Sequence, residues 1–279
     1  MTRPALRVFL PLAAAALLAA PAVWLWHGNT VAGTTAVTVR SPRLPAAFSG
    51  FRIAQVSDLH NASFGEKNGE LARLLRGARP DLIAVTGDLI EAEQSDAALA
   101  LMEQAVRIAP VYYAPGNHEA RMEGYPAFAE RLRGLGVQVL ENRAVLLSRD
   151  GGTLRLAGLS DPAFSPLPPE TAAGQALDAL VPDDGVYTLL LSHRPELLEV
   201  YAAHPVDLAL SGHAHGGQVR LPGIGGLYAP NQGVFPRLAS GVHRQGRTTL
   251  VVSRGLGHNP FLFRVNNPPE LVLVTLEQG

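Results

Sequence analysis

Five short clusters of histidine, aspartate and asparagine in this chain of 279 residues carry groups that could do chemistry. Their imidazole nitrogens and their carboxylate or amide oxygens are typical ligands of divalent metal ions. The candidates are Asp58 with His60, Asp88 with Glu91, Asn117 with His118, His193 alone, and His213 with His215. Nine histidines occur without one cysteine, which excludes thiolate zinc fingers, iron–sulfur clusters and cysteine nucleophiles. A metal bound here must have nitrogen and oxygen ligands, which suit manganese, iron or zinc.

Each cluster directly follows a short apolar run. Runs of this length, without the spacing of a helix, predict strands buried on one or both faces. They cover residues 51–56, 82–85, 111–114, 189–191 and 208–210. The chemically active residues are therefore expected at the carboxyl ends of strands.

Apolar residues recur at helical spacing between some of these runs. They lie at 71, 74, 75 and 78, at 99, 102 and 106, and at 128, 132 and 135. The second set follows Ser95, a candidate cap, and the third follows Pro126. Pro195 opens a further candidate helix. Alternating strands and helices predict parallel pairing, with ligands bound beyond the carboxyl ends of the strands. Each cluster taken alone is more often an ordinary turn or cap. Their shared position predicts that all five converge on one edge of the sheet.

In their order along the chain, the clusters resemble the sequence blocks of the calcineurin-like metallophosphoesterases. The blocks are Asp58-Leu-His60, Gly87-Asp88-Leu-Ile-Glu91, Gly116-Asn117-His118-Glu119, Ser192-His193-Arg-Pro and Gly212-His213-Ala-His215-Gly-Gly-Gln218. The resemblance covers about Phe51 to Gln218, and Glu91 stands where the family usually has aspartate. The stretches 253–257 and 267–271 are similar to a membrane-associated bacterial branch, which includes phosphodiesterases and UDP-2,3-diacylglucosamine pyrophosphatases.

The resemblance implies an α/β fold, a four-layer αββα sandwich with two sheets, and a site for two divalent metal ions. By resemblance, the first ion would be held by Asp58, His60, Asp88 and His215, and the second by Asp88, Asn117, His193 and His213. Asp88 would bridge the two ions. His118 is expected to act as a donor to the phosphate or the leaving oxygen, with Glu91 orienting it, so that Asp88, Glu91 and His118 are the expected catalytic residues.

The resemblance also implies a function, the hydrolysis of a phosphodiester or phosphoanhydride bond by a hydroxide that bridges the two metals. Two carboxylates and one hydroxide do not neutralise two divalent cations, so such a site attracts phosphate. The expected substrate is a phosphorylated small molecule or a lipid-linked one. A lipid-nucleotide pyrophosphatase of the UDP-2,3-diacylglucosamine type is one alternative, and a metal-binding module without catalysis is another.

The amino-terminal segment is strongly apolar. The run from Val8 to Trp26 has no charged residue and follows Arg3 and Arg7. As a helix it would span about 28 Å, close to the thickness of the hydrocarbon core of a bilayer. We interpret residues 1–29 as a signal anchor, and a signal peptide cleaved near Ala20-Pro21-Ala22 is the alternative.

The charge distribution around this segment predicts its orientation. No lysine or arginine follows the apolar run before Arg40, so the positive-inside rule leaves the amino terminus in the cytoplasm. Residues 30–48 are then a linker or an edge strand, and residues 49–279 form the catalytic domain. This domain is expected on the extracytoplasmic side of the cell membrane, or to be secreted or periplasmic if the segment is cleaved.

The overall composition limits the possible partners. The chain has 23 basic and 24 acidic residues, and only 17% of its residues are charged. Because no basic stripe is present, we expect no nucleic-acid-binding surface. No protein partner is predicted. The histidines outside the clusters, His27, His204, His243 and His258, are expected to be structural.

Overall fold

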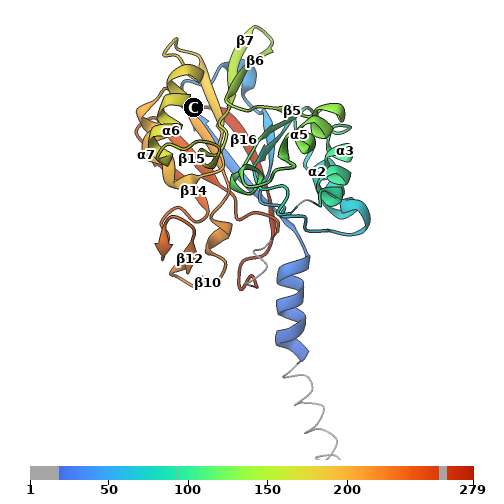
Figure 1. Ribbon diagram of the computed structural model, residues 1–279. Helices are drawn as coiled ribbons and strands as arrows, with labels where there is room; N and C mark the ends of the chain where they lie inside the picture. Colours follow the sequence, from blue (N-terminus) through green and yellow to red (C-terminus); the bar gives the residue numbers. More distant parts are fainter. Residues whose placement is uncertain (1–18, 93, 258–262) are drawn as a thin grey trace, which may run out of the picture.

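The computed structural model describes residues 19–92, 94–257 and 263–279, and two six-stranded sheets form its centre (Figure 1). The first sheet has the order β1-β16-β2-β3-β4-β5, with β1 at Gly33–Ser41, β16 at Glu270–Gln278, β2 at Arg52–Val56, β3 at Leu82–Thr86, β4 at Val111–Ala114 and β5 at Gln138–Val139. The second sheet has the order β14-β15-β9-β8-β7-β6, with β14 at Gly241–Gln245, β15 at Thr248–Val252, β9 at Leu208–Ser211, β8 at Tyr187–Leu191, β7 at Gly152–Gly158 and β6 at Arg143–Arg149.

Parallel strands occupy the part of each sheet that carries the predicted ligands. Strands β2 to β5 are parallel to one another, and so are β7, β8, β9 and β15. The five apolar runs coincide with β2, β3, β4, β8 and β9 to within two residues at each end. The predicted parallel pairing is therefore confirmed. The ligands do not follow the strands of one sheet, however, because β8 and β9 belong to the second sheet.

Helices cover the outer faces of both sheets. Helices α2 (Gly69–Ala78), α3 (Asp96–Ala105) and α5 (Tyr125–Gly134) share an apolar core with the first sheet, and α6 (Pro169–Leu180) and α7 (Leu198–Ala203) share one with the second. A third core lies between the sheets, where residues such as Ile53 and Leu82 pack with Leu189 and Leu208. The layers therefore follow the order helix, sheet, sheet, helix. Shorter elements are α4 (Asn117–Ala120), η1 (Ala46–Phe48), η2 (Glu66–Asn68), η3 (Pro162–Phe164), η4 (Pro195–Leu197) and η5 (His215–Gly217).

The predicted helices form where their apolar spacing places them, with one difference at a cap. Leu71 and Leu75 of α2 are fully buried one turn apart. Ser95 occupies the N-cap position of α3, but its hydroxyl makes no capping bond and accepts a hydrogen bond from Arg131 of α5 at 3.1 Å. Pro195 opens η4, which leads directly into α7.

The amino-terminal part of the described chain is a helix over residues 19–30, followed by β1. Of the two alternatives for residues 30–48, the structure has the edge strand, because β1 pairs along its whole length with β16. The predicted apolar span begins at Val8, and its residues 8–18 lie outside the described residues, as does His258. Among residues 19–92, 94–257 and 263–279, no helix has both the length and the apolar character required to cross a membrane.

Two small hairpins follow β9 in sequence. Strands β10 (Arg220–Leu221) and β11 (Gly225–Gly226) form the first, and β12 (Tyr228–Ala229) and β13 (Gly233–Val234) form the second. Both lie outside the two large sheets, at the end of the domain from which the helix over residues 19–30 extends (Figure 1).

Candidate metal centre

The loops that follow five parallel strands bring all seven predicted metal ligands together. Asp58 and His60 follow β2, Asp88 follows β3, Asn117 begins α4 after β4, His193 follows β8, and His213 and His215 follow β9. All seven residues are buried, with at most 9% of their surface exposed. Residues separated by more than 150 positions in sequence thus form one site between the two sheets.

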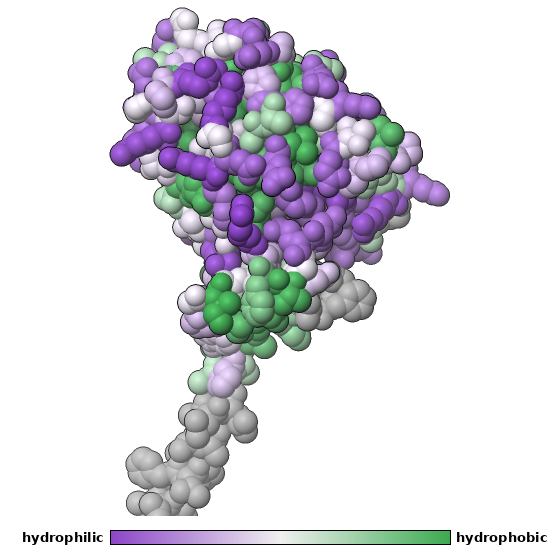
Figure 2. Space-filling view, turned by 90° about the vertical axis from the view of Figure 1, so that its left-hand side faces the viewer, coloured by the Kyte–Doolittle hydropathy of each residue, from purple (hydrophilic) through white to green (hydrophobic). Residues whose placement is uncertain are grey.

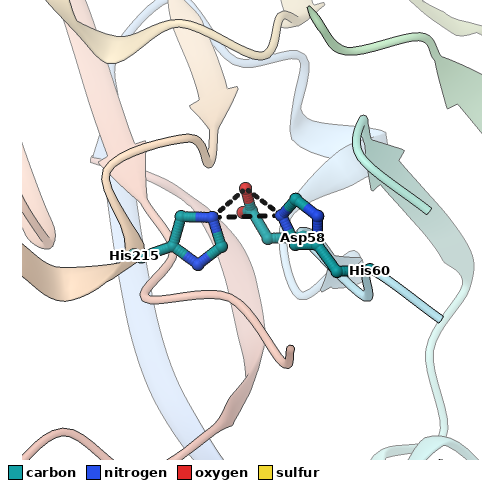
Figure 3. Close-up of side chains that lie close together, drawn as sticks. All are labelled: Asp58, His60 and His215. Carbon is teal, nitrogen blue, oxygen red and sulfur yellow. Dashed lines mark hydrogen bonds and ion pairs between the residues drawn. The ribbon is translucent and has the colours of Figure 1, made fainter. Parts of the chain in front are cut away.

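The first group of donor atoms belongs to Asp58, His60 and His215 (Figure 3). His60 Nε2 lies 3.1 Å from His215 Nε2, and His215 Nε2 lies 3.4 Å from Asp58 Oδ1. Burial lowers the pKa of His60 to about 3 and lowers that of His215 well below its usual range. Both rings are therefore neutral, and two neutral imidazole nitrogens facing one carboxylate oxygen form a donor set that suits a cation.

The second group is formed by Asp88, His193, His213 and Asn117. His193 Nε2 lies 3.0 Å from Asp88 Oδ2, 3.1 Å from Asn117 Oδ1 and 3.2 Å from His213 Nδ1. The Nδ1–H group of His193 donates to the carbonyl oxygen of Thr86 at 2.8 Å. Because that hydrogen bond fixes the tautomer, Nε2 is the nitrogen directed at the other donors.

Asp88 connects the two groups. Its Oδ2 atom is 3.0 Å from His193 Nε2 and 3.7 Å from His60 Nε2, so one oxygen faces both sides. Burial by itself raises the pKa of Asp88, but the neighbouring His193 outweighs burial and holds the pKa well below its usual range. Burial likewise lowers the pKa of His193, and Asp88 outweighs it and raises that pKa well above the usual range. The donor set fits two cations connected by Asp88, because the histidine and carboxylate donor atoms of each group converge within 4.8 Å.

The backbone of the site is strained. Five of the seven ligand candidates are non-glycine residues with φ in the left-handed region, namely Asp58 (52°), His60 (46°), Asp88 (52°), His213 (64°) and His215 (47°). Such conformations each cost about 1 to 3 kcal/mol for most residues and cluster at functional sites. The loops adopt them because each one turns sharply at a strand end to point its side chain inward.

Two glycines let these loops approach one another. Gly87 has φ of 88°, and a Cβ atom there would lie 2.7 Å from His193 Nδ1. At Gly212 a Cβ atom would lie 1.9 Å from Ser57 Oγ and 2.2 Å from Asp58 Oδ2. A side chain at either position would therefore displace a ligand candidate.

Comparison with known proteins agrees with this arrangement. The sequence model described as calcineurin-like phosphoesterase matches residues 51–217, which contain all seven ligand candidates. The chain belongs to the calcineurin-like phosphoesterase family. Like other members of this family, it is a hydrolase of phosphoester bonds.

Several relatives match most of this phosphoesterase chain. An uncharacterized metallophosphoesterase of Bacillus subtilis, YkuE, is 30% identical over 88% of this chain and 85% of its own length. The phosphodiesterase YaeI of Escherichia coli is 28% identical over 81% of this chain and 82% of its own. A Bos taurus protein described as a transmembrane protein with metallophosphoesterase domain is 29% identical over 87% of this chain and 56% of its own.

The fold also has a counterpart among solved structures. The TT1561 protein of Thermus thermophilus superimposes with a TM-score of 0.53 at 16% identity, over 74% of this chain and 90% of its own. This similarity supports the mixed α/β fold of the phosphoesterase with its parallel strands.

The two predicted catalytic residues that are not ligand candidates, His118 and Glu91, lie at the rim of the site. His118 Nε2 is 3.9 Å from Asp88 Oδ2, and its side chain is 27% exposed. Glu91 approaches a different histidine, with Oε2 3.9 Å from His60 Nδ1. Within the described part of the chain, Glu91 makes no hydrogen bond to His118, so the expectation that it orients His118 has no contact to support it.

Sequence reasoning assigned no role to Glu119, which organises the phosphoesterase site from behind. Its buried carboxylate accepts hydrogen bonds from the backbone amides of Asp88 and Gly116, at 2.9 and 2.8 Å, and from those of Leu89 and Ile90, at 2.8 and 3.3 Å. These bonds join the loop after β3 to the loop after β4. Its only sequence signal was its position directly after Asn117-His118.

A buried ion pair was also missed. Arg194 donates two hydrogen bonds to Asp161, with its Nε 2.8 Å from Oδ2 and its Nη2 2.9 Å from Oδ1. Arg194 follows His193 and lines the pocket of the site, whereas Asp161 comes from the loop after β7. The sequence offers no signal that joins two residues so far apart.

The metal centre lies at the floor of a polar pocket of about 230 Å³. Arg121 places positive charge on its wall, whereas the charge of Arg194, which also lines it, is paired with Asp161. Pro230 and Asn231 from the turn between β12 and β13 complete the wall. Such a pocket holds the volume of several water molecules and therefore admits a phosphoryl group with its substituents.

Proposed function

We propose that this phosphoesterase is a metal-dependent hydrolase of phosphodiester or phosphoanhydride bonds that uses two divalent ions. One observation carries the proposal, the two groups of converging donor atoms that Asp88 connects beneath a polar pocket. In this proposal the first ion has Asp58, His60, Asp88 and His215 as ligands, and the second has Asp88, Asn117, His193 and His213. Manganese, iron and zinc all suit these nitrogen and oxygen donors.

When bound, such ions supply a nucleophile at neutral pH and stabilise the charge of an in-line displacement. The residues of the chain position the ions, donate a proton and bind the substrate. Asp88 keeps the two groups at a fixed spacing, since its Oδ1 atom is also held by the backbone amide of His118 at 2.9 Å. In this proposal His118, which lines the pocket, donates a proton to the leaving oxygen. Arg121 attracts the anionic substrate to the pocket.

A diester is the favoured substrate class. The relative from Escherichia coli is named a phosphodiesterase, and its match extends over 81% of this chain. The surplus positive charge expected at the centre suits an anionic phosphate with two ester substituents, of which one leaves.

A lipid-linked nucleotide, cleaved at its pyrophosphate, is the second candidate substrate. The observation in its favour is the turn between β12 and β13, which lines the pocket through Pro230 and Asn231, while Val234 and Phe235 beside it expose apolar surface. An acyl chain could lie against those side chains. We further propose that the chain is anchored in the cell membrane by residues 1–29, with the catalytic domain on the extracytoplasmic side.

The test is hydrolysis of bis(p-nitrophenyl) phosphate by the purified full chain with Mn²⁺. Asp88→Asn is expected to lower kcat/KM at least about 100-fold, because it weakens a ligand shared by both ions. The matched control is Asp150→Asn, which changes an aspartate whose side chain is 83% exposed and is expected to leave the rate unchanged. Wild-type turnover in the Asp88→Asn variant would refute the proposed site. Absence of turnover in the wild-type protein, tested with each metal and with UDP-lipids, would favour the metal-binding module.

A further inference from the structure

The two hairpins beside the pocket expose several large apolar side chains. We call residues 220–236, which contain β10 to β13, the hairpin lobe. Its exposed apolar side chains are Leu221, Ile224, Leu227, Tyr228, Val234 and Phe235, of which Ile224 is 66% and Val234 64% exposed. Figure 2 shows a hydrophobic patch gathered at the end of the domain from which the amino-terminal stem extends. Contiguous exposed apolar surface of this kind marks an interaction site.

Hydrogen bonds connect the hairpin lobe to the amino-terminal helix. The side chain of Asn29, in the last turn of the helix over residues 19–30, donates to the carbonyl oxygen of Arg264 at 3.0 Å and accepts from the amide of Arg264 at 2.8 Å. The next residue, Val265, accepts from the amide of Arg220 at 2.9 Å. Phe263, on the other side of Arg264, is 67% exposed. The helix, Phe263 and the lobe are therefore held in fixed positions next to one another.

The sequence of the helix continues this apolar surface. The uncharged run from Val8 to Trp26 ends within the helix, and Val23, Trp24 and Trp26 are exposed there. Tryptophan is enriched where a chain passes from hydrocarbon to water. The described part of the apolar run, residues 19–26, therefore extends from the domain at the same end as the hairpin lobe (Figure 1).

The charges around the lobe favour an anionic surface over a second copy of the chain. Residues 220–237 contain Arg220 and Arg237 and no aspartate or glutamate. Arg237, which directly follows the lobe, is exposed. Two such surfaces would repel one another, whereas apolar side chains flanked by arginine suit the interface of a bilayer that contains anionic lipid.

We infer that the hairpin lobe and Phe263 insert into the interface of a lipid bilayer, next to the point at which the amino-terminal segment enters it. Apolar side chains of this size reach about 5 to 10 Å below the headgroups. The domain then contacts the membrane at two places and has a fixed orientation. The inference rests on the membrane anchor proposed above, and it does not depend on the reaction or on the metals.

Fluorescence quenching tests this contact in the full chain. Because the chain has no cysteine, Ile224→Cys and Val234→Cys each provide one labelling position in the lobe for an environment-sensitive dye. The matched control is Leu146→Cys, on β6 at the opposite end of the domain (Figure 1), where the side chain is 60% exposed and apolar. The proteins are reconstituted in vesicles of phosphatidylethanolamine and phosphatidylglycerol.

Lipids that carry a nitroxide near the headgroup are expected to quench the labels at 224 and 234 at least threefold more than the label at 146. Aqueous iodide is expected to give the opposite order. Equal quenching of all three labels by iodide would overturn the inference. Protection of the lobe from iodide without quenching by nitroxide lipid would overturn it as well, because the lobe would then be covered by protein. A chain that does not float with the vesicles would also contradict it.

Discussion

The carboxylate of Glu119 uses both of its oxygens. Oε1 accepts from the amides of Leu89 and Ile90, and Oε2 accepts from those of Asp88 and Gly116. Single residues of this kind, which contact ligands only through the backbone, decide how accurately a site is formed. Glu119 fixes the position of Asp88, which in turn is shared by both groups of donor atoms.

Glu119→Gln is expected to weaken metal binding and to lower kcat/KM, each about 10- to 100-fold. The amide NH₂ group must face two backbone N–H groups, since both oxygens of the native carboxylate are acceptors. Isothermal titration with Mn²⁺ and steady-state hydrolysis of the aryl diester measure the two effects.

The control is Glu123→Gln, which makes the same change at an exposed position four residues further along. It is expected to leave both quantities unchanged. The variant could instead bind Mn²⁺ with wild-type affinity and show only a lower melting temperature. Glu119 would then stabilise the fold without a role in positioning Asp88.

At the level of elements, the site depends on the contact between a loop of the first sheet and a loop of the second. Gly212 follows β9 and lies against Ser57 and Asp58, which follow β2. Gly212→Ala would place a Cβ atom 1.9 Å from Ser57 Oγ, so the two loops must separate. We expect a loss of about 1 to 3 kcal/mol in the free energy of unfolding and at least a tenfold loss of metal affinity.

The same substitution at Gly174 provides the comparison. This glycine lies inside α6, and its added Cβ would meet only His204 Cε1, at 4.0 Å. Gly174→Ala is expected to stabilise the protein by up to about 1 kcal/mol, since alanine favours the helix. Urea unfolding of both variants measures the difference, and a Gly212→Ala protein as stable and as metal-loaded as the wild type would contradict the tight contact.

A second link between the sheets depends on pH. Glu270 of β16 accepts hydrogen bonds from the Arg254 backbone amide and guanidinium, each at 2.7 Å, and from Thr35 Oγ1 at 2.6 Å. Burial by itself raises the pKa of Glu270, but Arg254 outweighs burial and the pKa lies below its usual value. The ionised carboxylate therefore stabilises the fold above its unfolded-state pKa of about 4.3, and this contribution is lost as the pH falls through the lower folded-state pKa.

Glu270→Gln is expected to destabilise the protein by about 3 kcal/mol at pH 7, because it leaves Arg254 without its buried partner. The difference from the wild type should shrink on acidification, as the wild-type carboxyl group takes up a proton. Urea unfolding at pH 7 and at pH 3 checks this, and a difference that is independent of pH would show that Glu270 acts through packing alone.

The elements were predictable where local sequence decides them. The run before Asp58 alternates between apolar and polar residues, the runs before Asp88 and His193 are continuously apolar, and all three end near a polar ligand candidate, so both their type and their direction could be inferred. The assignment of β8 and β9 to a second sheet could not be inferred from the runs, because strands of either sheet are equally apolar and pairing is decided by distant contacts. Ser95 has the sequence of a cap, but Arg131, which is distant in sequence, determines what its hydroxyl binds.

The contacts behind the site were less accessible to prediction than its ligands. Metal-ligating residue types at strand ends gave nine candidates, because the topology of parallel sheets brings such positions together. The resemblance to the phosphoesterase blocks then separated the seven predicted ligands from Glu91 and His118. Glu119 and the pair of Asp161 with Arg194 are defined by which backbone amide or side chain they meet. Residue type alone does not encode such a contact.

At the scale of the whole molecule, five strained residues and several buried histidines surround the proposed cation sites, so we expect bound cations to stabilise the fold. When the free metal concentration is about 100 times the dissociation constant, binding stabilises the folded protein by about 2.7 kcal/mol. Removing the cations is therefore expected to lower the melting temperature by about 5 to 10 °C. Thermal unfolding with Mn²⁺ and after chelation measures the shift.

The Asp88→Asn protein is the control for this shift. Since it lacks the shared ligand, its melting temperature should respond much less to Mn²⁺. A wild-type protein that melts at the same temperature in both conditions would mean that the strained loops are stabilised by the rest of the fold and not by metal.

The position of β16 has a consequence for biosynthesis. This strand lies between β1 and β2 in the first sheet, yet it is synthesised about 200 residues after β2. While the chain emerges from the ribosome, β1 and β2 have no partner on their shared side, and the first sheet cannot close until residues 270–278 are available. The first sheet is therefore completed only when this strand, the last in sequence, is inserted between two strands that were made long before it.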